Sequence, residues 1–506
     1  MSVGRYLLIR SYREVEADAL AIPAFRGVSL KEAYPELDAL CGGALGELSA
    51  SGAFKGEVGE AEVVYAPSTP FRKVIVVGCG ERPDDRFELL ELLRCFGGAA
   101  VGKAMRLRVE RLAVALPGDV GAGAEALKAV AEGAELANYV WVRKSSGEGL
   151  PTPVREVFIV GFKEVRGWKQ VLREVGIVGE ACRLGRDLAN APASEVNPDT
   201  FPTRVADAFK DLPVRVEVLD EARLREEGLN GVLAVGSGSV RRPKLLIIEY
   251  EGGGEGAPWY VVAGKGVCFD AGGLDLKQPK SMARMKYDKS GAAYAVAIAY
   301  AAAKLGLKLN LAVLAPLVEN LPSGSSYKPL DIIRMYNGLT VEVANTDAEG
   351  RLILADAMAY AVKRYSPRVI VDMATLTGGV VVALGNHAAG LFTNDDEIKE
   401  VMLEASRETG ERVWPFPLWR EYYRDIESDV ADVKNVGYPG VASAIIGAAF
   451  LSKFVGETPW AHLDIAGTAY ARDEGPSKPY HAKGATCFGV RLVLRFLTKL
   501  AGRGRG

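Results

Sequence analysis

The chain has 506 residues, of which 49% are hydrophobic and 25% charged, and its net charge at pH 7 is −2. This composition is that of a folded soluble protein, and the length predicts two or more domains. The balanced charge gives no support to a nucleic-acid partner held by bulk electrostatics, and no apolar run reaches the ~18 residues of a membrane span.

The first twenty residues carry only a short apolar run before charged residues return, which is too little for a secretion signal. The six cysteines are scattered without a CxxC pair, so we expect reduced, buried thiols and a cytoplasmic protein. The three histidines (His387, His462 and His481) do not have the spacing of a histidine-based zinc motif. Any metal would therefore be held mainly by carboxylates.

The first part of the chain predicts a small α/β domain over residues 1–165. Apolar, β-branched runs predict strands, and two longer patterns predict helices between them. The strands are expected at 5–10, 62–66, 73–78, 111–116 and 156–161, and the helices at 87–105 and 122–141. A helix over 166–190 is expected to connect this domain, with its central sheet, to a second one.

Residues 191–506 repeat the alternation and predict a larger α/β domain, with a mixed sheet covered by helices on both faces. Its strands are expected at 214–219, 244–250, 259–264, 309–316, 339–344, 368–375 and 460–467. An alanine-rich segment at 290–306 is apolar almost all round, which is typical of a buried helix.

Charged residues gather where these strands end. The segment "VVAGKGVCFDAGGLDLKQ" (261–278) places Lys265 directly after a strand and adds Asp270 and Lys277. Ligands bind beyond the carboxyl ends of strands in open α/β sheets, so these side chains lie at the expected edge.

The segment "VANTDAEGRL" (343–352) carries Asp347, Glu349 and Arg351 at alternate positions. If the segment is extended, the three side chains share one face and point into one space. A further acid, Asp288, lies in "MKYDKSGAA" (285–293).

Each of these residues also has a purely structural interpretation. Asp288 could cap the helix that follows it, and Arg351 could pair with Asp347 or Glu349. Together, however, four acids and two lysines among apolar segments are costly to bury without mutual pairing or a metal. Carboxylates without histidine suit hard dications or a dizinc or dimanganese site, and a lysine ligand would have to be neutral.

The chain resembles the leucyl aminopeptidases, also called cytosol aminopeptidases, of peptidase family M17. "NTDAEGRL" (345–352) matches the signature octapeptide of that family at every position. The likeness extends, from about residue 188 to the end, through "GKGVCFDAGGLDLK", "MKYDKSGAA", "PLVENLPSG", "ATLTGG", "SDVADVKNVG" and "HLDIAGTA".

The resemblance implies two divalent ions per subunit, Zn²⁺ or Mn²⁺. One would be held by Lys265, Asp270, Asp288 and Glu349. The other would be held by Asp270, Asp347 and Glu349, with the carbonyl of Asp347 as an extra ligand. Lys277 and Arg351 correspond to the two catalytic residues that do not bind metal.

The implied reaction is two-metal hydrolysis that releases N-terminal amino acids, preferably leucine and other apolar residues, from peptides with a free N-terminus. Lys277 would stabilise the oxyanion, and Arg351 would hold a bicarbonate acting as general base. The implied side-chain pocket consists of Met285, Thr375, Gly378, Ala466 and Ala469. The family further implies a homohexamer.

Three positions depart from the common family pattern: Ala271, Asp275 and Lys289, the last followed by Ser290. If extended, Asp275 and Lys277 share a face, and the acid could raise the pKa of the lysine. Lys289 is expected to face solvent or an interface.

Three other functions are less compatible with the sequence. A catalytically silent hexameric scaffold should have lost metal ligands, and all are present. An NAD-dependent oxidoreductase would need GxGxxG after a first strand, and "GCGERPDD" (78–85) does not match it. Another dimetal hydrolase, such as a phosphatase, would add clusters of histidine or arginine that the sequence does not show.

Overall fold

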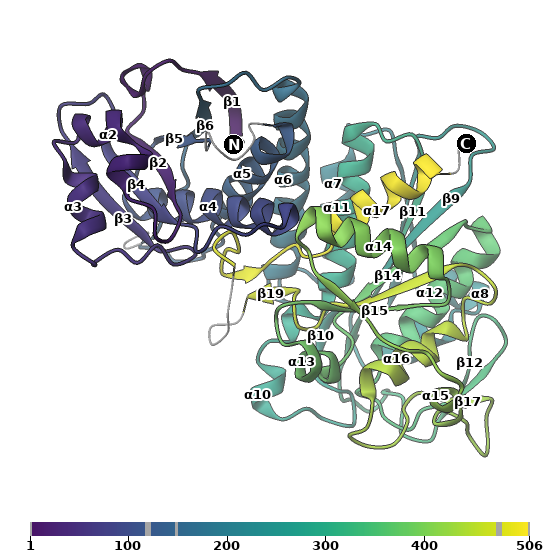
Figure 1. Cartoon of the computed structure of the whole chain (residues 1–506). Helices are drawn as coiled ribbons and strands as arrows, with labels where there is room; N and C mark the ends of the chain where they lie inside the picture. Colours follow the sequence, from purple (N-terminus) through teal and green to yellow (C-terminus); the bar gives the residue numbers. More distant parts are fainter. Residues whose placement is uncertain (1–2, 117–122, 147–149, 472–477, 504–506) are drawn as a thin grey trace. The chain divides into compact units, whose positions relative to one another are not determined.

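The strands of the protein form two main sheets, one in each of two units (Figure 1). The computed structural model describes residues 3–116, 123–146, 150–471 and 478–503. Contacts between residues group the chain into residues 1–180 with 476–483, and residues 181–475 with 484–506. The domain limits predicted at 165 and 190 stay a prediction. Within the described ranges, no helix is long and apolar enough to cross a membrane.

The first unit is built on a six-stranded sheet with the order β1-β6-β5-β2-β4-β3. Neighbouring strands are parallel except β3 and β4. The strands are β1 (Val3–Leu8), β2 (Ala19–Ala24), β3 (Ala61–Ala66), β4 (Arg72–Gly78), β5 (Arg111–Ala115) and β6 (Glu156–Gly161). The helices are η1 (Tyr12–Glu14), α1 (Leu30–Ala33), α2 (Pro35–Leu40), α3 (Ala44–Ala50), α4 (Arg86–Arg106) and α5 (Ala124–Ala137). Residue 122, the predicted start of the helix at α5, lies outside the described residues.

Strand β2 was not predicted because it contains Pro23, and a proline argues against a central strand. β2 does lie between β4 and β5. Its pairing with β5 ends at Ala21, however, so the missing N–H of Pro23 falls beyond that ladder.

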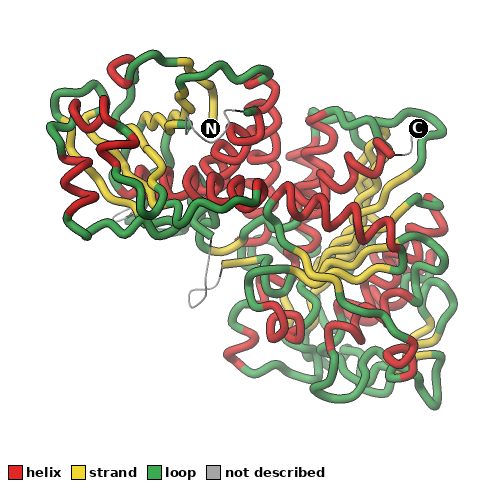
Figure 2. Tube along the Cα trace, viewed as in Figure 1, coloured by secondary structure: helices red, strands yellow, loops and turns green. Residues whose placement is uncertain are grey.

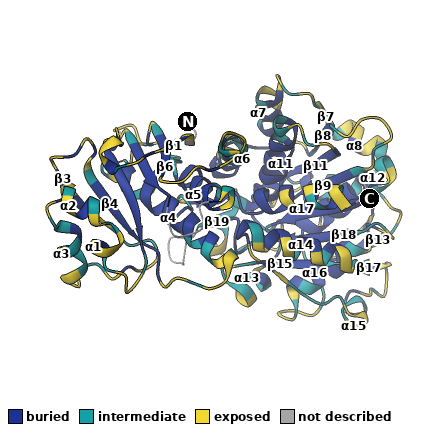
Figure 3. Cartoon of the chain, turned by 45° about the horizontal axis from the view of Figure 1, so that its top comes forward, coloured by how far each residue is buried: buried dark blue, intermediate teal, exposed yellow. Residues whose placement is uncertain are grey.

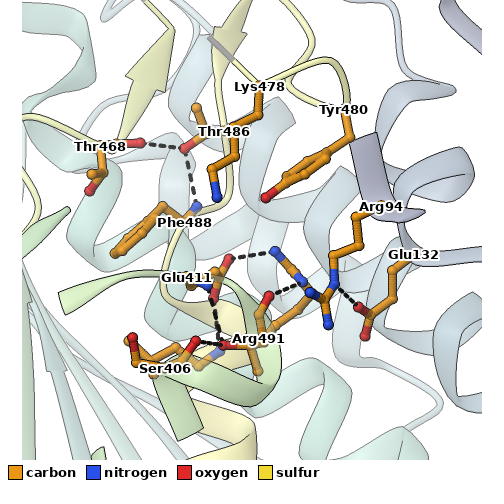
Figure 4. A network of polar contacts seen from close by, with 12 residues as sticks. Arg94, Glu132, Ser406, Glu411, Thr468, Lys478, Tyr480, Thr486, Phe488 and Arg491 are labelled. Carbon is orange, nitrogen blue, oxygen red and sulfur yellow. Dashed lines mark hydrogen bonds and ion pairs between the residues drawn. The ribbon is translucent and has the colours of Figure 1, made fainter. Parts of the chain in front are cut away.

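A segment from late in the chain packs into the first unit. Tyr480 and Lys478 both reach Glu91 on α4, at 2.7 and 2.5 Å, while Arg94 on the same helix donates to Glu132 on α5 at 2.7 Å (Figure 4). Burial opposes the ionisation of Glu91, but Lys478 and Arg94 hold the pKa of its carboxyl below the ordinary value. These ion pairs fix the returning segment to α4.

Helix α6 (Trp168–Asn190) occupies the predicted connection and continues into the second unit. The sheet of that unit has the order β16-β15-β18-β14-β9-β11-β8-β7, with β10 paired to β11. Its strands are β7 (Arg215–Leu219), β8 (Lys244–Glu251), β9 (Trp259–Gly264), β10 (Gly266–Asp270), β11 (Asn310–Asn320), β14 (Val369–Ala374), β15 (Ala389–Thr393), β16 (Val413–Pro415) and β18 (Trp460–Asp464). Two small sheets are formed by β12 (Ile332–Arg334), β13 (Thr340–Glu342) and β17 (Val433–Lys434), and by β19 (Tyr470–Ala471) and β20 (Gly484–Ala485).

Helices cover both faces of this mixed sheet (Figure 2), as the sequence predicts. The helices of this unit after α6 are α7 (Thr200–Phe209), α8 (Glu221–Glu227), α9 (Asn230–Gly236), α10 (Pro279–Met282), η2 (Met285–Lys289), α11 (Ser290–Leu305), α12 (Gly350–Tyr365), α13 (Gly378–Leu384), α14 (Asp396–Thr409), α15 (Arg420–Arg424), α16 (Ser443–Ser452) and α17 (Val490–Arg503). On one face α11 packs against β9, β11 and β14, and α17 packs on α11 and α14; on the other, α12 packs against β9 and β11, beside α9 and α16. The central strands are buried throughout (Figure 3), which explains their continuous apolar runs.

A buried ion pair joins two neighbouring strands of this sheet. Nδ1 of His462 on β18 lies 2.6 Å from Oδ1 of Asp372 on β14, and Trp460 donates to the other carboxylate oxygen at 2.7 Å. Burial opposes protonation of the imidazole, but Asp372 outweighs it and raises the pKa of His462 above its ordinary value.

This pair should make the stability of the protein depend on pH. Because the folded pKa of His462 is the higher one, its contribution is complete below about pH 6.5 and is lost as the pH rises through the raised pKa. We expect the free energy of unfolding of the wild type, measured relative to Asp372→Asn, to fall as the pH rises above about 6.5, because the amide of the variant can bond both neutral partners. Urea denaturation at several pH values measures this; equal slopes in both proteins would contradict it.

Candidate metal centre

The first lysine and acid of the site lie at the carboxyl ends of two strands. Lys265 follows β9, Asp270 ends β10, and both are buried. A Cβ on Gly264 would lie 2.4 Å from the carbonyl oxygen of Gly291, and one on Gly266 equally close to that of Pro316. The glycines around Lys265 are therefore required by the close approach of neighbouring backbone.

Asp288 lies in the short helix η2 and does not cap α11. That helix has no side-chain cap at its N-terminus. Instead, Oδ1 of Asp288 accepts from the hydroxyl of Thr375 at 2.8 Å, and Oδ2 lies 3.0 Å from Nζ of Lys265. The structural interpretation as a helix cap is thus wrong.

The extended conformation expected for residues 343–352 is also wrong. Residues 346–347 form a turn, and helix α12 begins at Gly350, so Arg351 lies in the first helical turn. Arg351 is buried, and its Nη1 donates to the carbonyl of Asn435 at 2.5 Å.

Despite this difference, the acids and lysines come together as the sequence predicts. Nζ of Lys265 lies 2.8 Å from Oε1 of Glu349, Nζ of Lys277 lies 2.8 Å from Oδ2 of Asp270, and Lys277 also contacts Asp347. One carboxylate oxygen each from Asp270, Asp347 and Glu349 lie within 4.8 Å of one another.

Burial opposes the ionisation of the four acids, and the positive charge of the two lysines favours it. Burial and the neighbouring Glu349 and Asp288 raise the pKa of Asp270 well above its ordinary value. Burial likewise raises the pKa of Asp288, to about 6, and that of Asp347. Burial acts in the same direction on Glu349, but Lys265 and Lys277 hold its pKa below the ordinary value.

The same attraction raises the pKa of both lysines, against the effect of burial. Four carboxylates thus face two ammonium groups, which leaves an excess of negative charge. Three buried carboxylate oxygens contact a lysine ammonium group but no other donor among the described residues: Oδ2 of Asp288, Oδ1 of Asp347 and Oε1 of Glu349. Buried carboxylate oxygens in a cluster with an excess of negative charge are suitable ligands for divalent cations.

The predicted pocket residues lie around two loops beside the cluster. Thr375 is next to Asp288, and its carbonyl accepts from Lys265 at 3.1 Å. Met285 begins η2, and Gly378 begins α13 with no other atom near the position of a Cβ. Ala466 follows β18 and is partly buried.

Asp464 links these loops, because it accepts from the N–H groups of Leu376 and Ala466 at 3.2 Å each and from Thr377 Oγ1 at 2.6 Å. Ala469 differs from the other pocket residues, since it is fully buried and its carbonyl accepts from Tyr294 and Thr486.

The departures from the family pattern have structural roles. The largest causes that raise the pKa of Lys277 are Asp270, Glu349 and Asp347, whereas the carboxylate of Asp275 accepts from the N–H of Thr346 at 2.7 Å. The N–H of Ala271 donates to the carbonyl of Asn320, and its own carbonyl accepts from Lys277 N–H, both at 2.9 Å.

The expectation that Lys289 faces solvent or an interface is wrong. The residue is fully buried, and its Nζ donates to the carbonyls of Ala191 at 2.9 Å and Lys286 at 2.6 Å. Burial lowers the pKa of Lys289 to about 8. Ser290 beside it is buried too, and its hydroxyl donates to the carbonyl of Tyr287.

Sequence reasoning missed three residues that support the cluster. Asn320 donates to Asp270 at 2.9 Å and to the carbonyl of Thr346 at 3.0 Å, and Tyr327 donates to the same carbonyl. Asn435 contacts the loop before Glu349. Asn320 and Asn435 lie in the segments "PLVENLPSG" and "SDVADVKNVG", whose likeness to the family could have indicated a role at the site.

Comparison with known proteins shows the family to which the chain is similar. Residues 183–494 match the model of the cytosol aminopeptidase family catalytic domain, and residues 21–146 match the N-terminal domain of that family. The chain is 38% identical to a probable cytosol aminopeptidase of Geotalea uraniireducens over 95% of both chains, and 38% identical to one of Cenarchaeum symbiosum over 92% of both.

Two solved structures are similar as well. Bottromycin maturation enzyme BotP in complex with Mn has a TM-score of 0.83 and 32% identity, and the match covers 96% of this chain and 100% of that one. A mutant of tomato leucine aminopeptidase has a TM-score of 0.85 and 29% identity, with 99% and 96% covered. The chain described here therefore belongs to the cytosol aminopeptidase family.

Proposed function

We propose that the protein is a metallo-aminopeptidase that releases N-terminal amino acids, preferably leucine and other apolar residues, from peptides. The observation that carries this proposal is the buried cluster of four carboxylates and two lysines, in which three carboxylate oxygens contact only a lysine ammonium group among the described residues. Membership of the cytosol aminopeptidase family supports the class of reaction.

The cluster would hold two divalent ions, Zn²⁺ or Mn²⁺. Lys265, Asp270, Asp288 and Glu349 would bind one, and Asp270, Asp347 and Glu349 the other. Bound there, the ions would supply an acidified water as nucleophile and would polarise the scissile carbonyl. The ion pairs of the two lysines would be replaced by the cations.

Two residues of the chain would assist the reaction without binding metal. Lys277 is the more exposed lysine, and its ammonium group would donate to the oxyanion of the tetrahedral intermediate. Nε of Arg351 has no acceptor among the described residues, so the guanidinium has a donor left for a small anion. A bicarbonate held there would act as general base.

Leucine preference is proposed from the pocket. Met285, Thr375, Gly378 and Ala466 are small or apolar and border the loops beside Asp288, which suits a branched aliphatic side chain. We further propose a homohexamer in the cytoplasm, in line with the family name.

The test compares Leu-p-nitroanilide with its N-acetylated form, using metal-stripped protein to which Mn²⁺ or Zn²⁺ is added. We expect metal-dependent release of p-nitroaniline from the free-amine substrate alone, because an aminopeptidase requires a free N-terminus. Folded, oligomeric protein that releases nothing with either metal would favour the catalytically silent scaffold.

A further inference from the structure

The motif "SDVADVKNVG" (428–437) contributes no ligand to the proposed metal site, yet one of its residues lies buried beside it. We propose that Asn435 is a positioning residue, which holds the loop 343–349 so that Asp347 and Glu349 reach the metal ions. This inference rests on the proposed function and assigns a role to a residue outside its ligand set.

The topology brings Asn435 to this loop. Strand β17 pairs in parallel with β13, with Glu342 opposite Lys434. Parallel strands that pair in register end at the same edge, so the residues that follow them, Asn435 and Val343, leave the small sheet side by side. Residues 343–349 belong to no helix or strand, and their polar backbone groups need partners from elsewhere.

The side-chain amide of Asn435 supplies such partners. Its Oδ1 accepts from the N–H groups of Ala344 at 2.8 Å and Asn345 at 3.3 Å. Its Nδ2 donates to the carbonyls of Asn345 at 2.7 Å and Ala348 at 3.4 Å. The residue is fully buried, where hydrogen bonds are strong and an unpaired group is costly.

A further hydrogen bond connects the residues that Asn435 holds to the proposed ligand Asp347. Oδ1 of Asn345 accepts from the N–H of Asp347 at 2.7 Å, so fixing Asn345 also fixes the start of the ligand turn. The residue between them, Thr346, is held from the other side by Asp275 and Asn320. The loop is thus clamped from two sides, and Asn435 is one of the two clamps.

The backbone of Asn435 also sets the position of Arg351. Its N–H donates to the carbonyl of Glu342 at 3.1 Å, and its carbonyl accepts from Nη1 of Arg351 at 2.5 Å. One buried residue therefore contacts both the loop that carries the acids and the guanidinium proposed to hold the anion.

The proposed role requires an amide, since both an acceptor and a donor are used. In Asn435→Asp the shape is kept, but a carboxylate oxygen would face the carbonyls of Asn345 and Ala348 and repel them. In Asn435→Ala both bonding groups are lost. Residues that orient metal ligands in this way typically contribute about 10–100-fold to metal affinity.

The experiment measures Zn²⁺ and Mn²⁺ binding to metal-stripped protein by competition with a chromophoric chelator, together with the thermal midpoint of each metal-free protein. Asn310→Asp is the matched control, because Asn310 is also buried and bonds a turn, through Gly253, Gly254 and Ala257, at the opposite end of β11 from Asn320. We expect two ions on the wild type and on Asn310→Asp, and a Kd raised about 10–100-fold in Asn435→Asp, most for the ion that Asp347 holds.

The outcomes separate the possible failures. If the wild type binds no metal, the proposed function fails. If Asn435→Asp binds both ions like the wild type and only its thermal midpoint falls, as in Asn310→Asp, Asn435 is a structural residue and the inference is wrong. Should the variants of Asn435 fail to fold, Asn345→Ala removes the next link at a partly exposed position, and unchanged metal affinity there would overturn the inference as well.

Discussion

Replacing Glu349 with glutamine should abolish the metal-dependent peptidase activity. Glu349 is buried, lies 2.8 Å from Lys265 and shares with Asp270 and Asp347 the space proposed for both ions. The amide keeps the shape of the side chain but removes the charge and one acceptor. We expect metal affinity to fall by more than about 100-fold, which is the upper end of what residues that only orient a metal ligand contribute. The activity should fall at least as far. Metal content and the rate of Leu-p-nitroanilide hydrolysis measure both effects.

The matched control is Glu249→Gln, because Glu249 is also buried, lies on β8 in the same unit and accepts hydrogen bonds from Arg364 and Tyr365. This variant should be less stable than the wild type and equally active at a temperature where it is folded. If Glu349→Gln retains two tightly bound ions and wild-type activity, the proposed assignment of the metal ligands is wrong.

Lys277→Met should lower kcat by about 100- to 1,000-fold while leaving the metal ions bound. The lysine pairs with Asp270 and Asp347 in the metal-free protein, and the proposed ions would take over these carboxylates. Its ammonium group is then available to the developing oxyanion, and a thioether of similar length provides no donor. Steady-state kinetics with saturating Mn²⁺, together with metal analysis of the same sample, measure the two quantities separately.

The contrast between the two variants is the decisive feature. Glu349→Gln should lose metal and activity together, whereas Lys277→Met should lose only kcat. A Lys277→Met protein without metal would place this lysine in the metal-binding set, and one with wild-type kcat would remove it from the catalytic residues.

The sequence predicted most strands of the two main sheets and four of the longer helices, because local patterns determine these elements. The predicted strands begin close to their observed starts, and the alanine-rich helix at 290–306 corresponds to α11. Strand β2 was not predicted because it contains Pro23. Whether the missing N–H of a proline disrupts a strand depends on where the neighbouring strand, here β5, stops pairing, and the local sequence does not contain this information.

The conformation of the signature segment could not be obtained from its own residues. Alternating side chains indicated an extended run, but the segment turns at 346–347 and starts a helix at Gly350. The bonds that impose this turn come from Asp275 and Asn435, 71 and 90 residues away in the chain. Long-range hydrogen bonds of this kind outweigh the conformation that the alternation of side chains indicates.

Lys289 shows the same limit. A lysine is rarely buried without partners, so the sequence favoured an exposed side chain. The fold provides two backbone carbonyls for its ammonium group, from Ala191 and Lys286, and these make burial tolerable.

The sequence by itself determined which side chains are available for a site: acids and lysines placed after apolar strands, without a histidine motif, from which we infer a carboxylate-rich metal site. Only the tertiary structure decided how those groups are held. Asn320, Asn435 and Asp464 bond the loops of the site from strand ends that are distant in sequence. Residue types follow from the chain alone, whereas the partners of a buried polar group depend on which strand ends the sheet brings side by side.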